Sequence, residues 1–138
     1  MKTQFDEEIK LSTVVTEDGI VELTLAGNIS SELHGEELTA WVRAAKETIV
    51  EQKAKQGGTA LCITDIGALR EFDDGSVEIL KSLASGEEVA DVKSAVIGGS
   101  LFSKMALRTI ILVTGRKNIK PFDSRESALV WLKSAEIA

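Results

Sequence analysis

Three carboxylates lie close together where the chain leaves a predicted strand and enters a predicted helix. Glu71, Asp73 and Asp74 form this group, and connections of this kind hold many of the sites in parallel sheets. Such side chains could bind a metal ion or act as an acid and base pair. The alternative is that the acids at the start of the helix bind its amides and favour its dipole, and we prefer it because no further metal ligand accompanies them.

A second group combines backbone flexibility with a hydroxyl. Gly98, Gly99 and Ser100 join a predicted strand to a predicted helix. Free amides at such a helix start could bind an anion such as a phosphate group, with Lys104 one turn further on. The stretch contains neither the phosphate-binding loop nor the dinucleotide motif. A tight turn in which Ser100 caps the helix explains the same residues, so both interpretations stay open.

Residues for nucleophilic catalysis are scarce. The chain has one histidine, His34, which we expect on the surface, and a metal site there would need a second imidazole or thiolate. Its one cysteine, Cys62, stands in a predicted strand, where a thiol is usually a small buried apolar group. A serine triad could be built only around His34, and no nucleophile elbow is present. We therefore expect no enzyme, no metal and no cofactor.

Charge is distributed unevenly along the 138 residues. The formal net charge of −6 argues against nucleic acid as a partner. Residues 101–120, LFSKMALRTIILVTGRKNIK, nevertheless include five basic side chains and no acidic one. This segregation predicts either a surface for an anionic partner or an internal match between a basic and an acidic face.

Hydrophobic periodicity predicts the elements that must position these residues. Strands are expected at 9–15, 20–26, 59–65, 93–99 and 118–122, and helices at about 31–56, 76–85, 101–113 and 124–135. The first two strands flank TEDG with period-two alternation, which is typical of a hairpin. The resulting order, ββαβαβαβα, predicts one α/β domain over residues 1–138, with a mixed, mostly parallel sheet flanked by helices.

Several residues refine these boundaries. Gly35 weakens the first turns of the long helix and favours a start near Glu36. Asp123 and Glu126 have the spacing of a capping box for the last helix. Pro121 cannot donate a backbone hydrogen bond, so the last strand is expected at an edge of the sheet. Both tryptophans, Trp41 and Trp131, lie beside apolar helix positions and are expected in or next to the core.

No pattern predicts export or membrane insertion. Apolar runs such as IILV at 110–113 are far too short to span a bilayer. The N-terminus, MKTQFDEEIK, lacks the apolar stretch of a signal peptide. We therefore expect a cytoplasmic protein.

Two stretches stand out beside the element order: TDIGALREFDDGSVEIL after the third strand and the ending NIKPFDSRESALVWLKSA. In these features the chain resembles the SpoIIAA-like group of STAS and Sec14-type domains. The resemblance implies a non-enzymatic α/β domain that regulates by protein contact or binds apolar ligands or membranes. Anti-sigma antagonists of this family carry a phosphorylatable serine in a turn that corresponds here to Asp73-Asp74-Gly75-Ser76. Asp74 occupies the serine position, so the ligand or membrane branch is the closer match.

The helix predicted at 101–113 has more apolar circumference than one sheet can cover. Lys104 and Arg108, four residues apart, share one stripe of it. The expected surface consists of Leu101, Phe102, Lys104, Met105, Arg108, Ile111, Leu112, Arg116 and Lys117. One hypothesis is that it binds an apolar or lipid-like ligand or lies at the inner face of an anionic membrane. The other is that it contacts a protein partner, as in a STAS-type signalling module, or a second copy of the chain.

Overall fold

The computed structural model describes residues 9–86, 89, 91–98, 104, 105, 107, 108, 111 and 118–134. The strands are β1 (Lys10–Val15), β2 (Val21–Ile29), β3 (Leu61–Asp65), β4 (Leu69–Phe72), β5 (Lys93–Ile97) and β6 (Ile119–Phe122). The helices are α1 (Ser31–Lys55), α2 (Asp74–Ala84) and α4 (Arg125–Leu132). Residues 104, 105, 107, 108 and 111 are also helical. They belong to the helix predicted at 101–113, whose remaining residues lie outside the described part of the chain.

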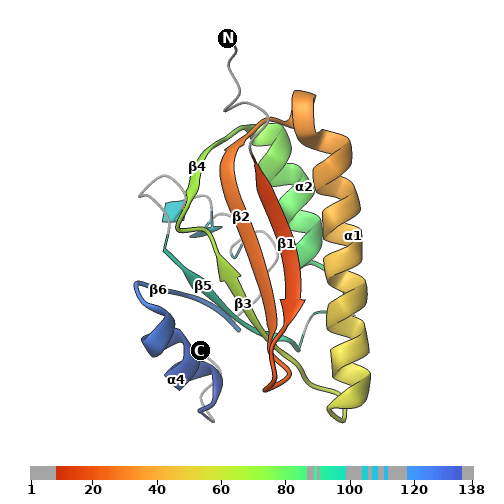
Figure 1. Cartoon of the computed structure of the whole chain (residues 1–138), viewed down its shortest axis with the longest axis vertical. Helices are drawn as coiled ribbons and strands as arrows, with labels where there is room; N and C mark the ends of the chain where they lie inside the picture. The colour runs from red at the N-terminus through yellow and green to blue at the C-terminus, as the bar shows by residue number, and fades with distance from the viewer. Residues whose placement is uncertain are drawn as a thin grey trace.

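The sheet is mixed and mostly parallel, as the element order predicts (Figure 1). Its strands run in the order β1-β2-β3-β5-β6, and among the described strand pairs only the β1–β2 hairpin is antiparallel. β6, which contains Pro121, forms one edge, and this confirms the position inferred from the missing backbone donor. The short strand β4 was not expected. It pairs in parallel with residues 27–29 at the end of β2, beyond the point where β3 stops.

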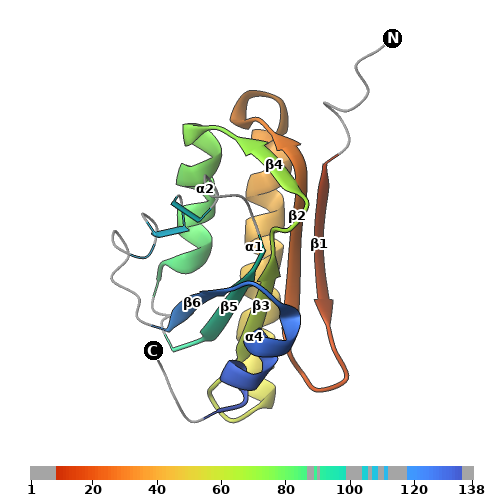
Figure 2. The same ribbon diagram turned by 90° about the vertical axis from the view of Figure 1, so that its left-hand side faces the viewer.

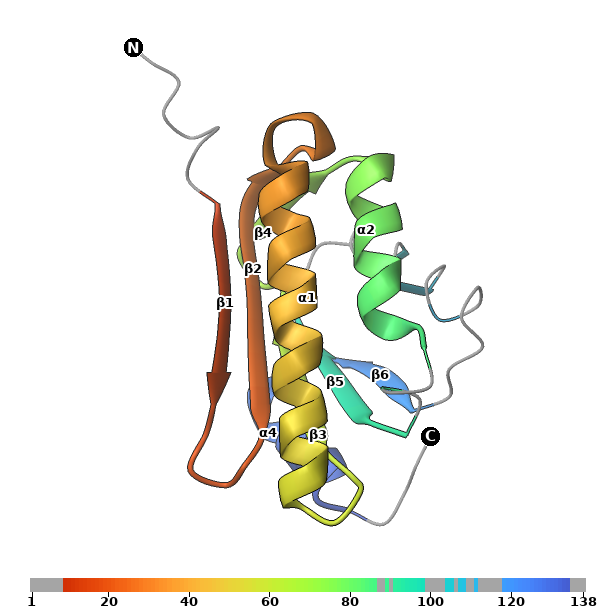
Figure 3. The same ribbon diagram turned by 90° about the vertical axis from the view of Figure 1, so that its right-hand side faces the viewer.

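Helices cover the two faces of the sheet unequally (Figure 2 and Figure 3). α1 and α2 lie on one face, where they and the strands share the larger group of buried side chains. α4 lies on the other face, where Ala128, Trp131 and Leu132 pack against Ile63 and Ala95. Alternation along each strand explains this arrangement, because successive side chains of β3 and β5 point to opposite faces.

The long helix α1 follows its apolar periodicity. Its buried side includes Leu38, Trp41, Val42, Ala45 and Ile49, and burying each large apolar side chain stabilises the fold by roughly 1.5 to 3 kcal/mol. The predicted start near Glu36 is wrong, because the helix begins at Ser31. The Ser30 hydroxyl accepts the backbone N–H groups of Glu32 and Leu33, and this cap offsets the cost of Gly35.

The last helix also begins differently from the prediction. Ser124, not Asp123, is its N-cap, and the Ser124 hydroxyl accepts the N–H of Ser127 at 3.1 Å. At the other end, Lys93 Nζ donates to the carbonyl oxygen of Trp131 at 2.5 Å and lies 4.5 Å from the centre of its ring. This lysine therefore ties the carboxyl end of α4 to β5 and covers the buried tryptophan.

Candidate functional site

An apolar cavity of about 130 Å³ lies between the sheet and α2. The strands contribute its floor, α2 contributes Val77, Leu80 and Leu83, and Leu107 reaches it from the helical segment after β5. The other described lining residues are Leu23, Leu25, Ile49, Cys62, Thr64, Ile66, Leu69, Phe72, Val89, Val92, Ser94, Val96 and Ile119. No charged side chain lines the cavity among the described residues. Its walls therefore suit an uncharged, largely apolar molecule.

Cys62 and two hydroxyl residues are the exceptions in this lining. Cys62 is buried on β3 as expected. Thr64 follows it on the same face of β3, and Ser94 lies on the neighbouring strand β5 in register with Cys62. In the described part of the chain, neither the Thr64 nor the Ser94 hydroxyl has a hydrogen-bond partner. Thr64 and Ser94 are the hydroxyl residues that line the cavity in the described part of the chain.

Asp73 connects the starts of the two helices that lie on this face of the sheet. As N-cap of α2, it accepts the Ser76 N–H at 2.9 Å and the Ser76 hydroxyl at 2.7 Å through Oδ1. Its Oδ2 accepts the N–H of Ser31 at 3.0 Å and the Ser31 hydroxyl at 2.9 Å. The Ser76 hydroxyl and the Ser31 amide hold the pKa of Asp73 well below its ordinary value of 3.8, against the opposing effect of desolvation.

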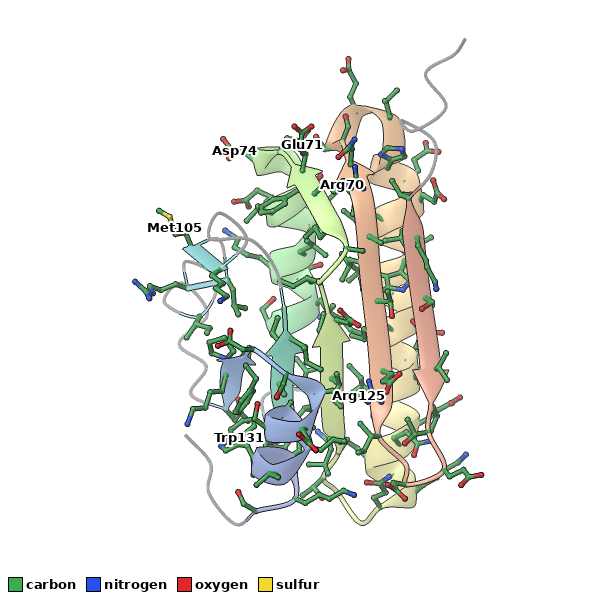
Figure 4. The ribbon with its side chains drawn as sticks, turned by 60° about the vertical axis from the view of Figure 1, so that its left-hand side comes forward. Arg70, Glu71, Asp74, Met105, Arg125 and Trp131 are labelled. Carbon is green, nitrogen blue, oxygen red and sulfur yellow. The ribbon has the colours of Figure 1, made fainter. Side chains whose placement is uncertain are left out.

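The carboxylates singled out in the sequence do not converge on one point. Asp73 accepts hydrogen bonds from the first turns of α1 and α2. Glu71 on β4 and Asp74 in the first turn of α2 are exposed (Figure 4). Within the described residues, no group of three or more histidine, cysteine or acidic side chains could hold a metal ion. Ser76 is 0% exposed and its hydroxyl is bound to Asp73. The arrangement corresponds to helix capping rather than to acid-base chemistry.

The glycine turn after β5 is described only in part. Gly98 has φ +80°, and its N–H donates to the carbonyl oxygen of Phe122 at 3.2 Å. A Cβ atom at this position would lie 2.8 Å from Cα of Gly67. The close approach of two backbones explains why glycine stands here. Gly99 and Ser100, the other two residues of the predicted anion contact, lie outside the described residues.

The basic and apolar surface predicted around 101–117 is also described in part. Lys104 and Arg108 are exposed, and Met105 is 58% exposed and points away from the sheet (Figure 4). Lys104 Nζ lies 3.2 Å from Oδ1 of Asp123, so part of its charge is matched within the chain. Ile111 is half-buried. The other predicted members, Leu101, Phe102, Leu112, Arg116 and Lys117, lie outside the described residues.

Two features of the structure, the position of His34 and the cavity, differ from what the sequence predicts. The expectation of a surface histidine is wrong, because His34 is only 6% exposed and its Nδ1 accepts the N–H of Ser30 at 3.0 Å. The cavity itself was also missed. One signal for it was present in the sequence, since the hydroxyl residues Thr64 and Ser94 stand next to apolar residues in β3 and β5.

Comparisons with known proteins agree with this architecture. The sequence matches no protein-family model and no curated protein. An uncharacterised protein of the DUF3478 family from Shewanella loihica PV-4, solved with a SpoIIAA-like fold, matches with a TM-score of 0.52 and 18% identity, over 90% of this chain and 93% of that chain. A proposed anti-sigma factor antagonist from Thermotoga maritima matches with a TM-score of 0.55 and 10% identity, over 90% and 95%. The SpoIIAA-like fold that the resemblance implied is therefore confirmed.

None of the described helices is long and apolar enough to cross a bilayer.

Proposed function

We propose that this protein is a non-enzymatic binding domain that takes up a small apolar ligand in the cavity beneath α2. The single observation that carries this proposal is the apolar cavity of about 130 Å³. Protein interiors are close-packed, and few voids exceed the size of a water molecule. A ligand that fills this space would bury the apolar side chains that line it, and that burial would be the main source of its affinity.

The helical segment at 104–111 supports a membrane or lipid source for such a ligand. Leu107 lines the cavity, while Lys104, Met105 and Arg108 of the same segment face solvent. An exposed apolar side chain between two cations suits the surface of an anionic bilayer, where each cation contributes about 1 kcal/mol. We therefore propose that this segment lies at the membrane surface when the ligand enters or leaves. The predicted residues outside the described part of the chain belong to this proposal as well.

A second candidate function is regulation by protein contact, as in a STAS-type signalling module. It is favoured by the likeness to the proposed anti-sigma factor antagonist from Thermotoga maritima. A phosphorylation switch in the corresponding turn receives no support, because Ser76 is fully buried and Asp74 stands in the serine position. This second candidate is therefore a contact with a partner protein or with a second copy of the chain, without a phosphorylation switch.

Benzene provides a direct test of the cavity. At ten times its Kd, a ligand that binds only the folded protein adds about 1.4 kcal/mol of stability, or roughly 3 to 5 °C in Tm for a domain of this size. We expect this shift for the unmodified protein and its loss in Val77→Phe, which places a ring in the cavity from α2. Val130→Phe is the matched control, because Val130 is 71% exposed on α4. The proposal fails if near-saturating benzene leaves Tm unchanged.

A further inference from the structure

The lining of the cavity is mostly apolar, and its two hydroxyl residues, Thr64 and Ser94, lie on adjacent strands. β3 and β5 are parallel neighbours, with Cys62 opposite Ser94 and Thr64 opposite Val96. Thr64 and Ser94 therefore face the same side of the sheet, one two-residue step apart. Both are half-buried beneath the helices, and both line the cavity.

The hydroxyls of Thr64 and Ser94 differ from the serine hydroxyls at the starts of α1 and α2, which all have hydrogen-bond partners. Among the described residues, Ser76 and Ser31 donate to Asp73, and the Ser30 hydroxyl accepts amides of α1, but no partner is present for the hydroxyls of Thr64 and Ser94. Both side chains are half-buried, and neither hydroxyl is among the fully buried unpaired polar atoms of the described residues. Each is therefore accessible to the hydrogen-bonding group of a ligand in the cavity.

Volume limits what could bind these hydroxyls. An engineered apolar cavity of about 150 Å³ in another protein binds benzene, and the cavity here measures about 130 Å³. A ligand that fills this volume is about the size of one six-membered ring. Because no charged side chain lines the described cavity, a carboxylate or ammonium group would enter without a counter-charge, at high cost.

We propose that the ligand is a benzene-sized ring or short chain carrying an uncharged hydrogen-bonding group, and that Thr64 and Ser94 bind that group. This inference rests on the proposed function, since it specifies the ligand class of the same cavity. The apolar walls supply most of the affinity, and the two hydroxyls select ligands with a hydroxyl, carbonyl or similar group over pure hydrocarbons.

Three probes of similar size test the selection. Benzene, phenol and benzoate differ in one substituent, and their dissociation constants can be compared by calorimetry or by NMR titration. We expect phenol to bind the unmodified protein, and benzoate to bind at least tenfold more weakly than phenol. In Thr64→Val plus Ser94→Ala, the ratio of phenol affinity to benzene affinity should fall about five- to tenfold, which is the effect of about one net hydrogen bond.

Matched variants separate the effect of losing a hydroxyl from the effect of changing the shape of the cavity. Thr64→Ser keeps the hydroxyl and should keep the phenol preference. Thr24→Val makes the same chemical change on the opposite face of β2, between the cavity-lining Leu23 and Leu25, and should leave all three affinities unchanged. If the double variant does not fold, the two single variants carry the test.

The outcomes distinguish this inference from the proposed function. If benzene binds but the phenol-to-benzene ratio is the same in the unmodified protein and the hydroxyl-free variants, the role of Thr64 and Ser94 is wrong and the cavity proposal stands. Tight binding of benzoate would contradict the requirement for an uncharged group. If none of the probes binds, the cavity proposal and this inference fail together.

Discussion

The carboxylate of Asp73 binds both the backbone amide and the hydroxyl of Ser31, a residue 42 positions earlier in the chain. The same carboxylate caps α2 through Ser76, so one side chain binds the amino-terminal ends of α1 and α2. α2 lines the cavity and lies beside α1. The connection through Asp73 therefore joins the two helices at the end where α2 begins.

Replacing Asp73 should destabilise the fold in a pH-dependent way. We expect Asp73→Ala to lower the free energy of unfolding by about 1 to 2 kcal/mol at pH 7, because it removes the cap of α2 and the bonds to Ser31. The pKa of Asp73 is depressed in the folded state, so its contribution is present above the ordinary value of 3.8 and is lost as the pH falls below it. Urea denaturation at pH 7 and pH 3 measures both effects.

Asp74→Ala is the control for this experiment. It removes a charge from the same turn of α2 but leaves the hydrogen bonds of Asp73 in place. Its cost should be smaller, about 0.3 to 1 kcal/mol through the helix dipole. Two outcomes would contradict this prediction. One is an equal loss of unfolding free energy in the two variants at pH 7, and the other is a loss in Asp73→Ala that stays constant down to pH 3. Either would show that the bonds of Asp73 to both helices do not add to the stability of the fold.

Two glycines should respond to alanine in opposite directions. Gly35 lies inside α1, and an added Cβ would meet no atom within 4 Å, so Gly35→Ala should raise the free energy of unfolding by about 0.5 to 1 kcal/mol. Gly98→Ala should lower it by at least about 1 to 2 kcal/mol, because φ is +80° and the new Cβ would lie 2.8 Å from Cα of Gly67. Thermal or chemical denaturation of the two variants gives the signs. A stabilising Gly98→Ala would mean that the turn after β5 differs from the one described.

The exposed cations near the cavity predict binding to anionic vesicles. We expect the protein to co-sediment with vesicles containing phosphatidylserine at low salt. Lys104→Gln plus Arg108→Gln should weaken that binding by roughly 30-fold, at about 1 kcal/mol per residue. Arg43→Gln plus Lys55→Gln, on the exposed side of α1, is the control with the same change in net charge. No sedimentation even at low salt would remove the membrane part of the proposal, and equal losses in both variants would show that the binding depends on net charge alone.

Several parts of the architecture could be predicted from local patterns. The hairpin, α1 and the buried strand β3 have strong periodicity, because one face or both faces of each must be apolar to pack. The predicted helix starts were wrong where two local signals compete. Ser30 and Gly35 give opposite indications for the start of α1, and Asp123 and Ser124 are adjacent residues that can both cap a helix. Strand β4 is too short for periodicity to reveal, and its pairing with β2 is a long-range contact.

The candidate site shows the same division. Asp73 was correctly placed at the start of a helix, but its bond to Ser31 depends on the packing of α1 beside α2. His34 was misplaced because the residues around it are polar, and only the fold shows its ring bound to the Ser30 amide.

By itself, the sequence determined the order of the elements apart from β4, the mostly parallel direction of the sheet and the apolar character of its faces. These follow from side-chain periodicity and backbone chirality along short stretches. Tertiary structure alone decided that α2 and Leu107 leave a space above β3 and β5, and that Thr64 and Ser94 face it. A cavity is a difference between the volume that side chains fill and the volume that the backbone encloses, and that difference exists only after distant segments have packed together.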